Sequence, residues 1–182
     1  MLSLLLIVIL GFAAFRGVRR GFVFQTVHTI GYLIVFYLAS KNFEKLSDKL
    51  ELLVPYPQPA LDSNLIYYSG QQLFDLDQYY YAGVAFLLIL LIGWAVIRFT
   101  GFFFYGLTFF DLFGVVGKIL SGILAVMVAM VTLSCILNVV AMVPLDFVQN
   151  MIEGSGLAKF IIANLPYYSN KIIELWTQTA VS

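Results

Sequence analysis

The side chains best suited to chemistry form one stripe in an otherwise apolar segment of the chain. Four polar residues follow one another at positions i, i+3, i+4 and i+7, namely Gln25, His28, Thr29 and Tyr32. This spacing places them on one face of a helix. His28 is the single histidine of the sequence, and a histidine inside a membrane can relay protons. The stripe therefore predicts either a polar path through an oligomer or hydrogen bonds between packed helices.

A second group of candidate residues is basic and lies between two apolar runs. Three arginines occur close together, Arg16, Arg19 and Arg20, with Gly17 and Gly21 beside them. Because unpaired arginines are costly to bury, the segment from Arg16 to Gly21 is predicted to form a tight turn between two membrane helices at the water–lipid boundary. The arginines could bind anionic headgroups or a cytoplasmic partner, or they could serve only to fix the topology.

Other groups that could carry chemistry are isolated in the sequence. Lys118 follows Asp111 by seven residues, which allows an ion pair at the mouth of a helix, although a lysine at such a place commonly acts as a snorkelling anchor. Cys135 and Asn138 lie deep in an apolar run and are expected to serve packing. The sequence offers no Ser-His-Asp or Cys-His set, no phosphate-binding glycine loop and no clustered metal ligands. We therefore predict a protein that is not an enzyme and has no catalytic residues, cofactor or metal site.

Composition indicates the class of protein. Of the 182 residues, 62% are hydrophobic and only 11% are charged, whereas roughly a quarter of the residues of a soluble domain are charged. Basic and acidic residues are equal in number at 10 each, which gives no reason to expect a nucleic acid partner. A single cysteine excludes an internal disulfide. These features predict a one-domain integral membrane protein that lies in the lipid bilayer.

Four apolar runs predict four membrane-spanning helices, at residues 1–15, 21–40, 80–99 and 118–143. The first run begins without the basic segment of a cleavable signal, so it is expected to remain in the chain as a helix. The predicted fold class is therefore all-α, a polytopic helical membrane protein.

Three further regions connect or follow these runs. Residues 42–54 carry apolar positions three and four apart with charged residues between them, which predicts an amphipathic helix on the membrane surface in the outer loop. The tail, residues 145–178, is broken by glycine and proline into short amphipathic pieces. Residues 99–113 are rich in aromatic side chains and suit an interfacial or partly re-entrant connector.

Small residues mark the fourth apolar run. They recur every four positions, as Gly117, Ser121, Ala125 and Ala129, and the same block contains Lys118 and Gly122. Small side chains let helix backbones approach closely in lipid, so this stripe is predicted to be a helix-packing surface.

One segment resembles a known family. Residues 15–25 read Phe-Arg-Gly-Val-Arg-Arg-Gly-Phe-Val-Phe-Gln, and they resemble the first-hairpin motif of the colicin V production protein (CvpA) family. That motif is an Arg-Gly turn, a basic residue, Gly-Phe and then Gln or Glu. The matching residues are Arg16, Gly17, Arg19, Arg20, Gly21, Phe22 and Gln25. Residues 117–122 are similar to a second motif of the family, with Ser121 in the place of the motif's first glycine.

The resemblance implies a bacterial inner-membrane or plasma-membrane protein that supports production and export of a peptide toxin of the colicin V type. No molecular activity is established for the family. Some relatives carry the same four-helix unit fused to an extracytoplasmic trypsin-like protease, which implies that the unit can act as an anchor or regulator.

Together, the residues and the resemblance predict an accessory protein of the cell membrane that acts through protein–protein contacts along the small-residue stripe of the fourth run, from Gly117 to Ala129. Its expected partner is a membrane or envelope protein or a second copy of the chain. A small oligomeric transporter or channel, and an anchor for an envelope partner, are the alternatives. Basic residues divide evenly between the two sides of the predicted bundle. The clustered arginines of the short first hairpin nevertheless favour a cytoplasmic arginine end, with both termini outside.

Overall fold

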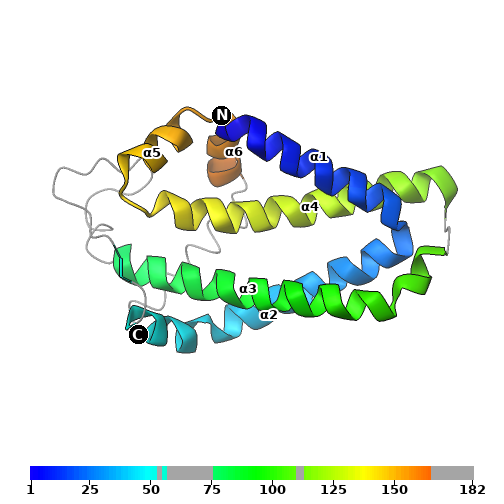
Figure 1. Cartoon of the computed structure of the whole chain (residues 1–182), viewed down its shortest axis with the longest axis horizontal. Coiled ribbons are helices and arrows are strands. Elements are labelled where there is room, and N and C mark those ends of the chain that lie inside the picture. Colours follow the sequence, from blue (N-terminus) through cyan, green and yellow to red (C-terminus); the bar gives the residue numbers. More distant parts are fainter. Residues whose placement is uncertain (53–54, 57–75, 110–112, 165–182) are drawn as a thin grey trace.

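The computed structural model describes residues 1–52, 55–56, 76–109 and 113–164, and most of these residues are helical (Figure 1). In chain order the helices are α1 Leu2–Arg20, α2 Phe22–Glu51, α3 Leu76–Phe103, the 3-10 helix η2 Tyr105–Phe109, α4 Gly114–Ala141, α5 Asp146–Glu153 and α6 Gly156–Asn164. The described ranges contain no strand. The predicted all-α fold is therefore confirmed.

Four of these helices, α1 to α4, are long and apolar enough to cross a membrane. A bilayer core of about 30 Å requires roughly 20 helical residues. α1 has 19 residues, α2 has 30, and α3 and α4 have 28 each. Each helix extends past its predicted apolar run at one end at least, because a backbone near lipid keeps its hydrogen bonds satisfied by remaining helical, although α4 ends at Ala141, short of residue 143. The chain is thus a multi-pass membrane protein.

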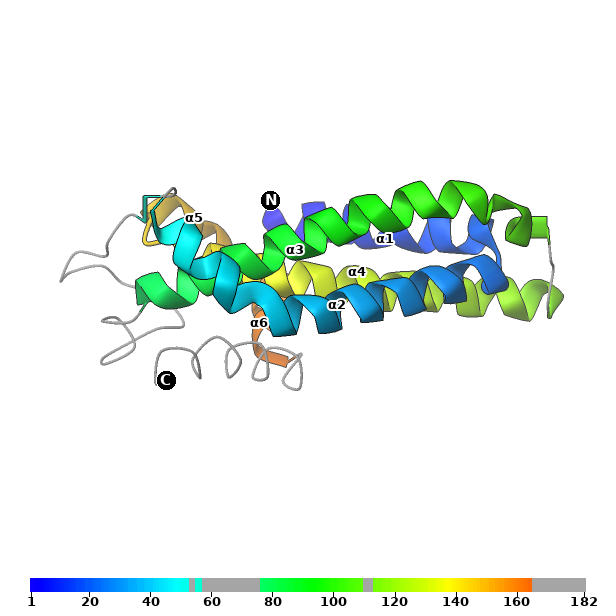
Figure 2. The same cartoon turned by 90° about the horizontal axis from the view of Figure 1, so that it is seen from below.

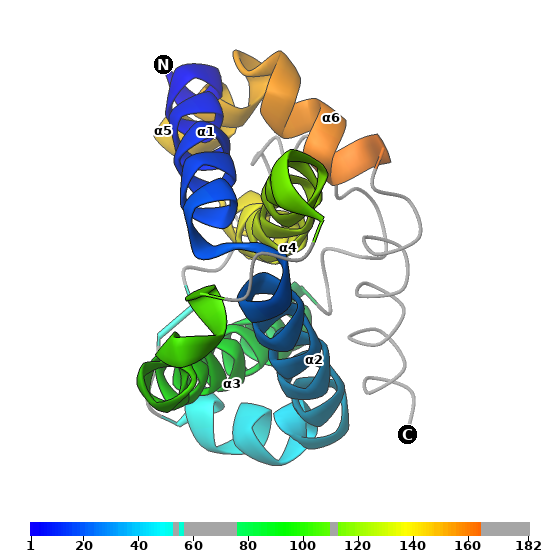
Figure 3. The same ribbon diagram turned by 90° about the vertical axis from the view of Figure 1, so that its right-hand side faces the viewer.

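The long helices are arranged as two pairs. α1 packs on α4, and α2 packs on α3, whereas the consecutive helices α1 and α2 make few contacts. Seen along the bundle, the α1/α4 pair lies on one side and the α2/α3 pair on the other, with α2 and α4 adjacent at the centre (Figure 3). α1 and α3 are not packed on each other. The order of packing therefore differs from a simple succession of hairpins.

The tight turn expected from Arg16 to Gly21 is wrong. α1 continues through Arg20, and Gly21 alone separates it from α2. Gly21 has φ 78°, a left-handed backbone conformation that favours glycine. Arginine is a good helix former whose long side chain can reach the interface, so the helix continues without leaving backbone groups unpaired in lipid. Gly17 consequently lies inside a helix.

The separate surface helix expected at residues 42–54 is also wrong, because residues 42–51 continue α2 to its end, while residues 53–54 lie outside the described ranges. Phe43 and Leu50 are buried on one face, as the apolar spacing indicates. Ser40 and Asn42 donate side-chain hydrogen bonds to carbonyls of the preceding turn, a pattern that bends helices. Beyond this point the last turns of α2 pass across α3 (Figures 2 and 3).

The connector between α3 and α4 stays at one end of the bundle. The first part of residues 99–113 belongs to α3, which ends at Phe103, and η2 then lies against the start of α2. The ring of Phe113, the residue before α4, packs edge-on against Phe22 with centroids 5.8 Å apart. Residues 110–112 lie outside the described ranges. The described part of the connector is therefore helical and does not enter the bundle (Figure 1).

The apolar core lies at the opposite end, which also holds α5 and α6. Its largest fully buried side chains include Phe43, Phe86, Leu76 and Met142. The hydroxyl groups of Ser3 and Ser155 share a 2.8 Å hydrogen bond, which ties the start of α1 to the junction of α5 and α6. These two helices fall within the predicted amphipathic tail, and the rest of that tail, residues 165–178, lies outside the described ranges.

Side chains cap the C-terminal carbonyls of α4. Gln149 Nε2 donates to the carbonyls of Ala141 and Val143 at 3.1 and 2.9 Å. The Tyr56 hydroxyl donates to the Met142 carbonyl at 2.8 Å. Burial raises the pKa of the Tyr56 phenol, which keeps it protonated as a donor. The end of α4 is thus held by α5 and by the segment after α2, because a helix end leaves carbonyls that need partners.

Candidate functional site

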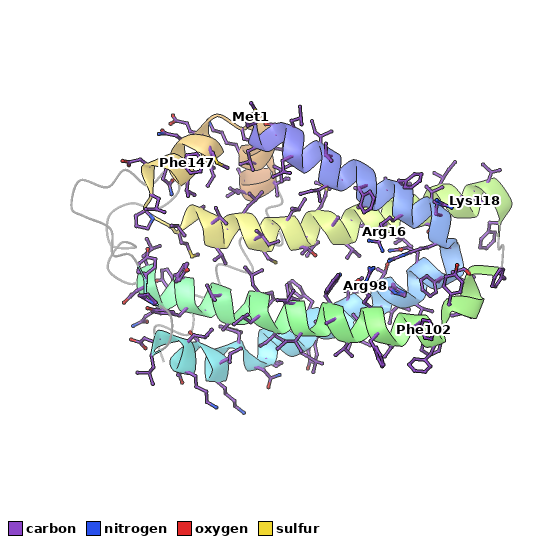
Figure 4. All side chains as sticks on the ribbon, in the orientation of Figure 1. Met1, Arg16, Arg98, Phe102, Lys118 and Phe147 are labelled. Carbon is purple, nitrogen blue, oxygen red and sulfur yellow. The ribbon has the colours of Figure 1, made fainter. Side chains whose placement is uncertain are left out.

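The carboxylates of the described ranges lie at one end of the bundle, whereas basic residues occur at both ends, with lysines of α2 and α6 at the carboxylate end. The end where α1 and α3 finish carries Arg16, Arg19, Arg20, Arg98 and Lys118 (Figure 4). The carboxylates of the described ranges lie at the other end, on α2, α3 and α5: Glu44, Asp48, Glu51, Asp77, Asp146 and Glu153. Within these ranges none of the four arginines forms an ion pair. The expected pair of Lys118 with Asp111 falls outside the described residues. We call the basic region the arginine end.

Aromatic rings support the arginines of this end. Each guanidinium carbon lies 5.5 to 5.9 Å from the centroid of a ring four residues away: Arg16 over Phe12, Arg19 over Phe15, Arg20 over Phe24 and Arg98 over Trp94. Cation–π contacts of this kind contribute about 0.5–1 kcal/mol at exposed sites. For the three pairs within one helix, the i, i+4 spacing of arginine and aromatic residues is the sequence signal, whereas Arg20 and Phe24 lie on either side of Gly21, on α1 and α2. These contacts hold the charged groups near the helix surfaces.

Three of the arginines, on two helices, lie within electrostatic range of one shared neighbour, Tyr32. Arg20 of α1 interacts electrostatically with Arg16 and with Arg98 of α3, and Figure 4 shows Arg16 and Arg98 in the space between α1 and α3. Tyr32 of α2 lies within electrostatic range of all three. We call Arg16, Arg20 and Arg98 the arginine cluster. The sequence pattern grouped Arg19 with its neighbours, but Arg19 is not among the charges that act on Arg20 or Tyr32, whereas Arg98 from a distant part of the chain is.

The predicted polar stripe of α2 begins beside this cluster. Gln25 and His28 are buried, with only 2% and 5% of their surfaces exposed, while Thr29 and Tyr32 are half-buried. Thr29 donates to the Gln25 carbonyl at 2.8 Å, and His28 Nδ1 lies 3.2 Å from the Phe24 carbonyl. In the described ranges these hydrogen bonds remain inside α2. The stripe therefore does not supply the hydrogen bonds between helices that the sequence allowed as one alternative.

His28 occupies a packed position. A Cβ atom at Gly101 would lie 2.8 Å from both Cε1 and Nε2 of its ring, so the glycine of α3 makes room for the imidazole. The Phe24 ring lies 4.2 Å from the imidazole between centroids. Gln25 Oε1 is buried and has no hydrogen-bond partner in the described part of the chain, a condition that costs about 1–3 kcal/mol. His28 is thus a helix-packing residue, and Gln25 is the unsatisfied group of the stripe.

The two sequence motifs meet where α1 crosses α4. Ser121 is fully buried, and its hydroxyl donates to the Gly17 carbonyl at 2.5 Å and to the Gly21 carbonyl at 3.1 Å. A Cβ atom at Gly17 would lie 2.7 Å from the Ser121 carbonyl oxygen and 2.5 Å from Ala125 Cβ. The serine therefore binds the arginine-bearing turns of α1 directly to the small-residue stripe of α4. This crossing fixes the position of the arginine cluster on α1.

The other residues of the stripe lie at different depths. Gly117 is buried, and a Cβ atom at Gly122 would lie 2.9 Å from Val18 of α1. Ala129 is half-buried and Lys118 is exposed. The stripe is thus largely covered by α1 of the same chain, which leaves little of it for another protein.

The remaining candidate groups are separated from one another. Cys135 is fully buried within α4. Asn138 donates to the Ser134 carbonyl at 2.8 Å within the same helix. Among the described residues, no three His, Cys, Asp or Glu side chains come together, so this part of the chain offers no metal-binding group.

Comparisons with known proteins give a consistent result. A family model described as "Colicin V production protein" matches residues 2–166, a span that contains all the helices from α1 to α6. The sequence is also similar to the "Uncharacterized transmembrane protein YshB" of Bacillus subtilis (strain 168). The two are 26% identical over 183 residues, which cover 98% of each chain. No solved structure matches the chain.

Proposed function

Because the chain belongs to the colicin V production protein family, we propose that it is a non-enzymatic accessory protein of the bacterial cell membrane. It supports the production or export of a peptide toxin through contacts with a membrane or envelope protein. The observation that carries this proposal is the extent of the family match, which takes in the whole bundle and not one motif alone. In the described ranges, the buried polar groups mainly serve helix packing, which favours an assembly role over catalysis.

The contacts with a partner belong to the outward faces of the bundle. Ser121, Gly122 and Ala125 lie against α1, so the small-residue stripe is not the surface offered to a partner. The long helices expose many apolar side chains, including Ile92 of α3 and Met127 of α4. In a membrane these faces contact lipid or another helix, and close packing of helices there provides the binding energy.

The arginine end faces the cytoplasm in this proposal, and the N-terminus and α5 lie on the extracytoplasmic side. Support comes from the clustering of Arg16, Arg19 and Arg20 where Gly21 alone joins α1 to α2, because positive charge in short loops close to helix ends is the strongest determinant of orientation. With α4 returning to the outer side, the C-terminus is also extracytoplasmic.

Complementation tests the proposed role. In a strain that produces colicin V but lacks its own family member, expression of this chain should restore secretion of the toxin, measured as a zone of growth inhibition. Gly11→Ala should restore it equally, because nothing lies within 4 Å of a side chain there. Gly17→Ala should fail, because the α1/α4 crossing is disrupted. Correct membrane insertion of the wild-type chain without any recovery of secretion would contradict the proposal.

Cysteine labelling tests the orientation. In a Cys135→Ala background, Phe109→Cys places a thiol at the arginine end and Asn150→Cys places one on α5, both at exposed positions. A membrane-impermeant maleimide should label the α5 thiol in intact cells and the arginine-end thiol only after permeabilisation. The reverse pattern would contradict the orientation.

A further inference from the structure

The geometry points to a phosphate-binding site between α1 and α3 that takes the headgroup of an anionic phospholipid. Its ligands are the arginine cluster, Arg16 and Arg20 from α1 and Arg98 from α3, with the Tyr32 hydroxyl of α2 nearby. This site is independent of the proposed role in toxin export.

α1 and α3 lie at the same edge of the bundle and are not packed on each other (Figure 3). Arg16 and Arg98 nevertheless face the space between them (Figure 4), and Arg20 interacts electrostatically with both. The cluster therefore brings cations from two separate helices within electrostatic range of one another, which a topology signal on a single loop does not require.

Like charges held together repel one another, and a carboxylate within about 4–6 Å is the usual compensation. In the described part of the chain, none of the three arginines has an ion pair, and the carboxylates lie at the far end of the bundle. The cationic surroundings thus favour a bound anion. Arginine presents a planar fork of donors that matches phosphate in a bidentate manner, and three such groups can surround one phosphate.

The rings beside the cluster distinguish a lipid from free phosphate. Arg16 and Arg98 each lie over a ring one helical turn further into the membrane, Phe12 and Trp94. Both rings are exposed, at 59% and 45% of their surfaces. A headgroup phosphate at the arginines would therefore place the glycerol and acyl region of a lipid beside exposed aromatic rings. Basic pockets between spanning helices on the cytoplasmic side bind anionic lipid headgroups in this way.

The test measures binding of phosphatidylglycerol to the full chain in detergent by native mass spectrometry. Combined Arg16→Gln and Arg98→Gln should weaken binding about tenfold or more. Arg19→Gln is the matched control, because Arg19 carries the same charge at the same end but lies outside the cluster. It should weaken binding less than about twofold. Equal losses in both variants, or equal affinity of the wild-type chain for phosphatidylcholine, would overturn the proposal.

Two further arms complete the test. Inorganic phosphate at the same concentration should leave phosphatidylglycerol bound, and its displacement of the lipid would overturn the lipid assignment. Arg98→Lys keeps the charge but removes the guanidinium fork, so binding should fall between wild type and Arg98→Gln. Arg98 is exposed on α3, so if the double variant does not fold, Arg98→Gln alone decides the result. Unchanged affinity of that variant would also overturn the site.

Discussion

The two helix pairs of this bundle are held together in different ways. Where α1 crosses α4, a Cβ atom at Gly17 would meet the Ser121 carbonyl oxygen at 2.7 Å, so the backbones themselves are in contact. Between α2 and α3, glycines receive side chains of the opposite helix, as Gly122 of α4 also receives Val18 of α1, and none of them meets a backbone atom of the partner helix as Gly17 does. A Cβ atom would lie 2.8 Å from the His28 ring at Gly101 and 3.3 Å from Ile97 at Gly31, and at Gly93 it would meet the Val35 side chain.

The difference shows which of the two contacts a second substitution can relieve after a glycine has been replaced. A side chain set into a glycine gap can be shortened to restore the space, whereas a backbone carbonyl cannot be removed. In lipid, where apolar burial does not drive helices together, close contact and hydrogen bonding determine the pairing. The α1/α4 pair has both, since Ser121 also donates to the Gly17 carbonyl. The pair that carries Arg16 and Arg20 is therefore the less adjustable one.

The largest effect is expected from Gly17→Ala. The new methyl group would collide with the backbone of α4, so the free energy of unfolding in detergent should fall by about 2–3 kcal/mol. Gly11→Ala in the same helix is the control, because nothing lies within 4 Å of a Cβ atom there. A compensating Ala125→Gly should recover less than about 0.5 kcal/mol, since the Ser121 carbonyl remains in place. Full recovery would show that the backbones are not in contact.

A smaller loss is expected from Gly93→Ala in the other pair. Its methyl group would collide with the Val35 side chain, and we expect a cost of about 1–2 kcal/mol. In this pair, a second substitution should recover part of the lost stability. Val35→Ala removes the colliding methyl groups, so the double variant should show a favourable coupling energy of about 1 kcal/mol in a double-mutant cycle. Strict additivity of the two changes would contradict a side-chain contact.

Ser121→Ala should have the smallest effect of the three. It removes the hydrogen bonds to the carbonyls of Gly17 and Gly21, and such bonds between membrane helices contribute about 0.6–1.7 kcal/mol. Thr132→Ala on the same helix is the matched control, because that hydroxyl is exposed and bonds only within α4. Equal unfolding free energies for the two variants would show that the Ser121 hydroxyl does not stabilise the α1/α4 crossing.

The sequence predicted which segments form helices better than it predicted which helices pack on each other. The length and apolar composition of the runs are enough to predict the four spanning helices, because each helix forms its own backbone hydrogen bonds in lipid. The small residues of α4 indicated a packing surface, but no periodicity says which helix covers it. Gly17 looked like a turn residue because it lies among arginines. Arginines at a helix end can snorkel, so α1 continues and Gly17 becomes a contact point.

The arginine cluster was only partly visible in the sequence. Arg16 and Arg20 are one turn apart on a helix, and this spacing places them on one face. Arg98 lies almost eighty residues later and joins them only because α3 runs beside α2. Such long-range neighbours follow from the packing of whole helices and have no local signal. The arginine–aromatic pairs, at i, i+4, are the exception that the sequence could have indicated.

One crosslinking measurement tests the crossing of α1 and α4 most directly. A Cβ atom at Gly122 would lie 2.9 Å from Val18 Cγ2, so Val18→Cys with Gly122→Cys should form an intramolecular disulfide in a Cys135→Ala background. Gly11→Cys with Gly122→Cys is the control, since the thiol then lies about 10 Å further along α1. In oxidised membranes we expect the first pair to crosslink and the second to remain reduced. Absence of a crosslink in the first pair, with the chain correctly inserted, would contradict the α1/α4 pairing.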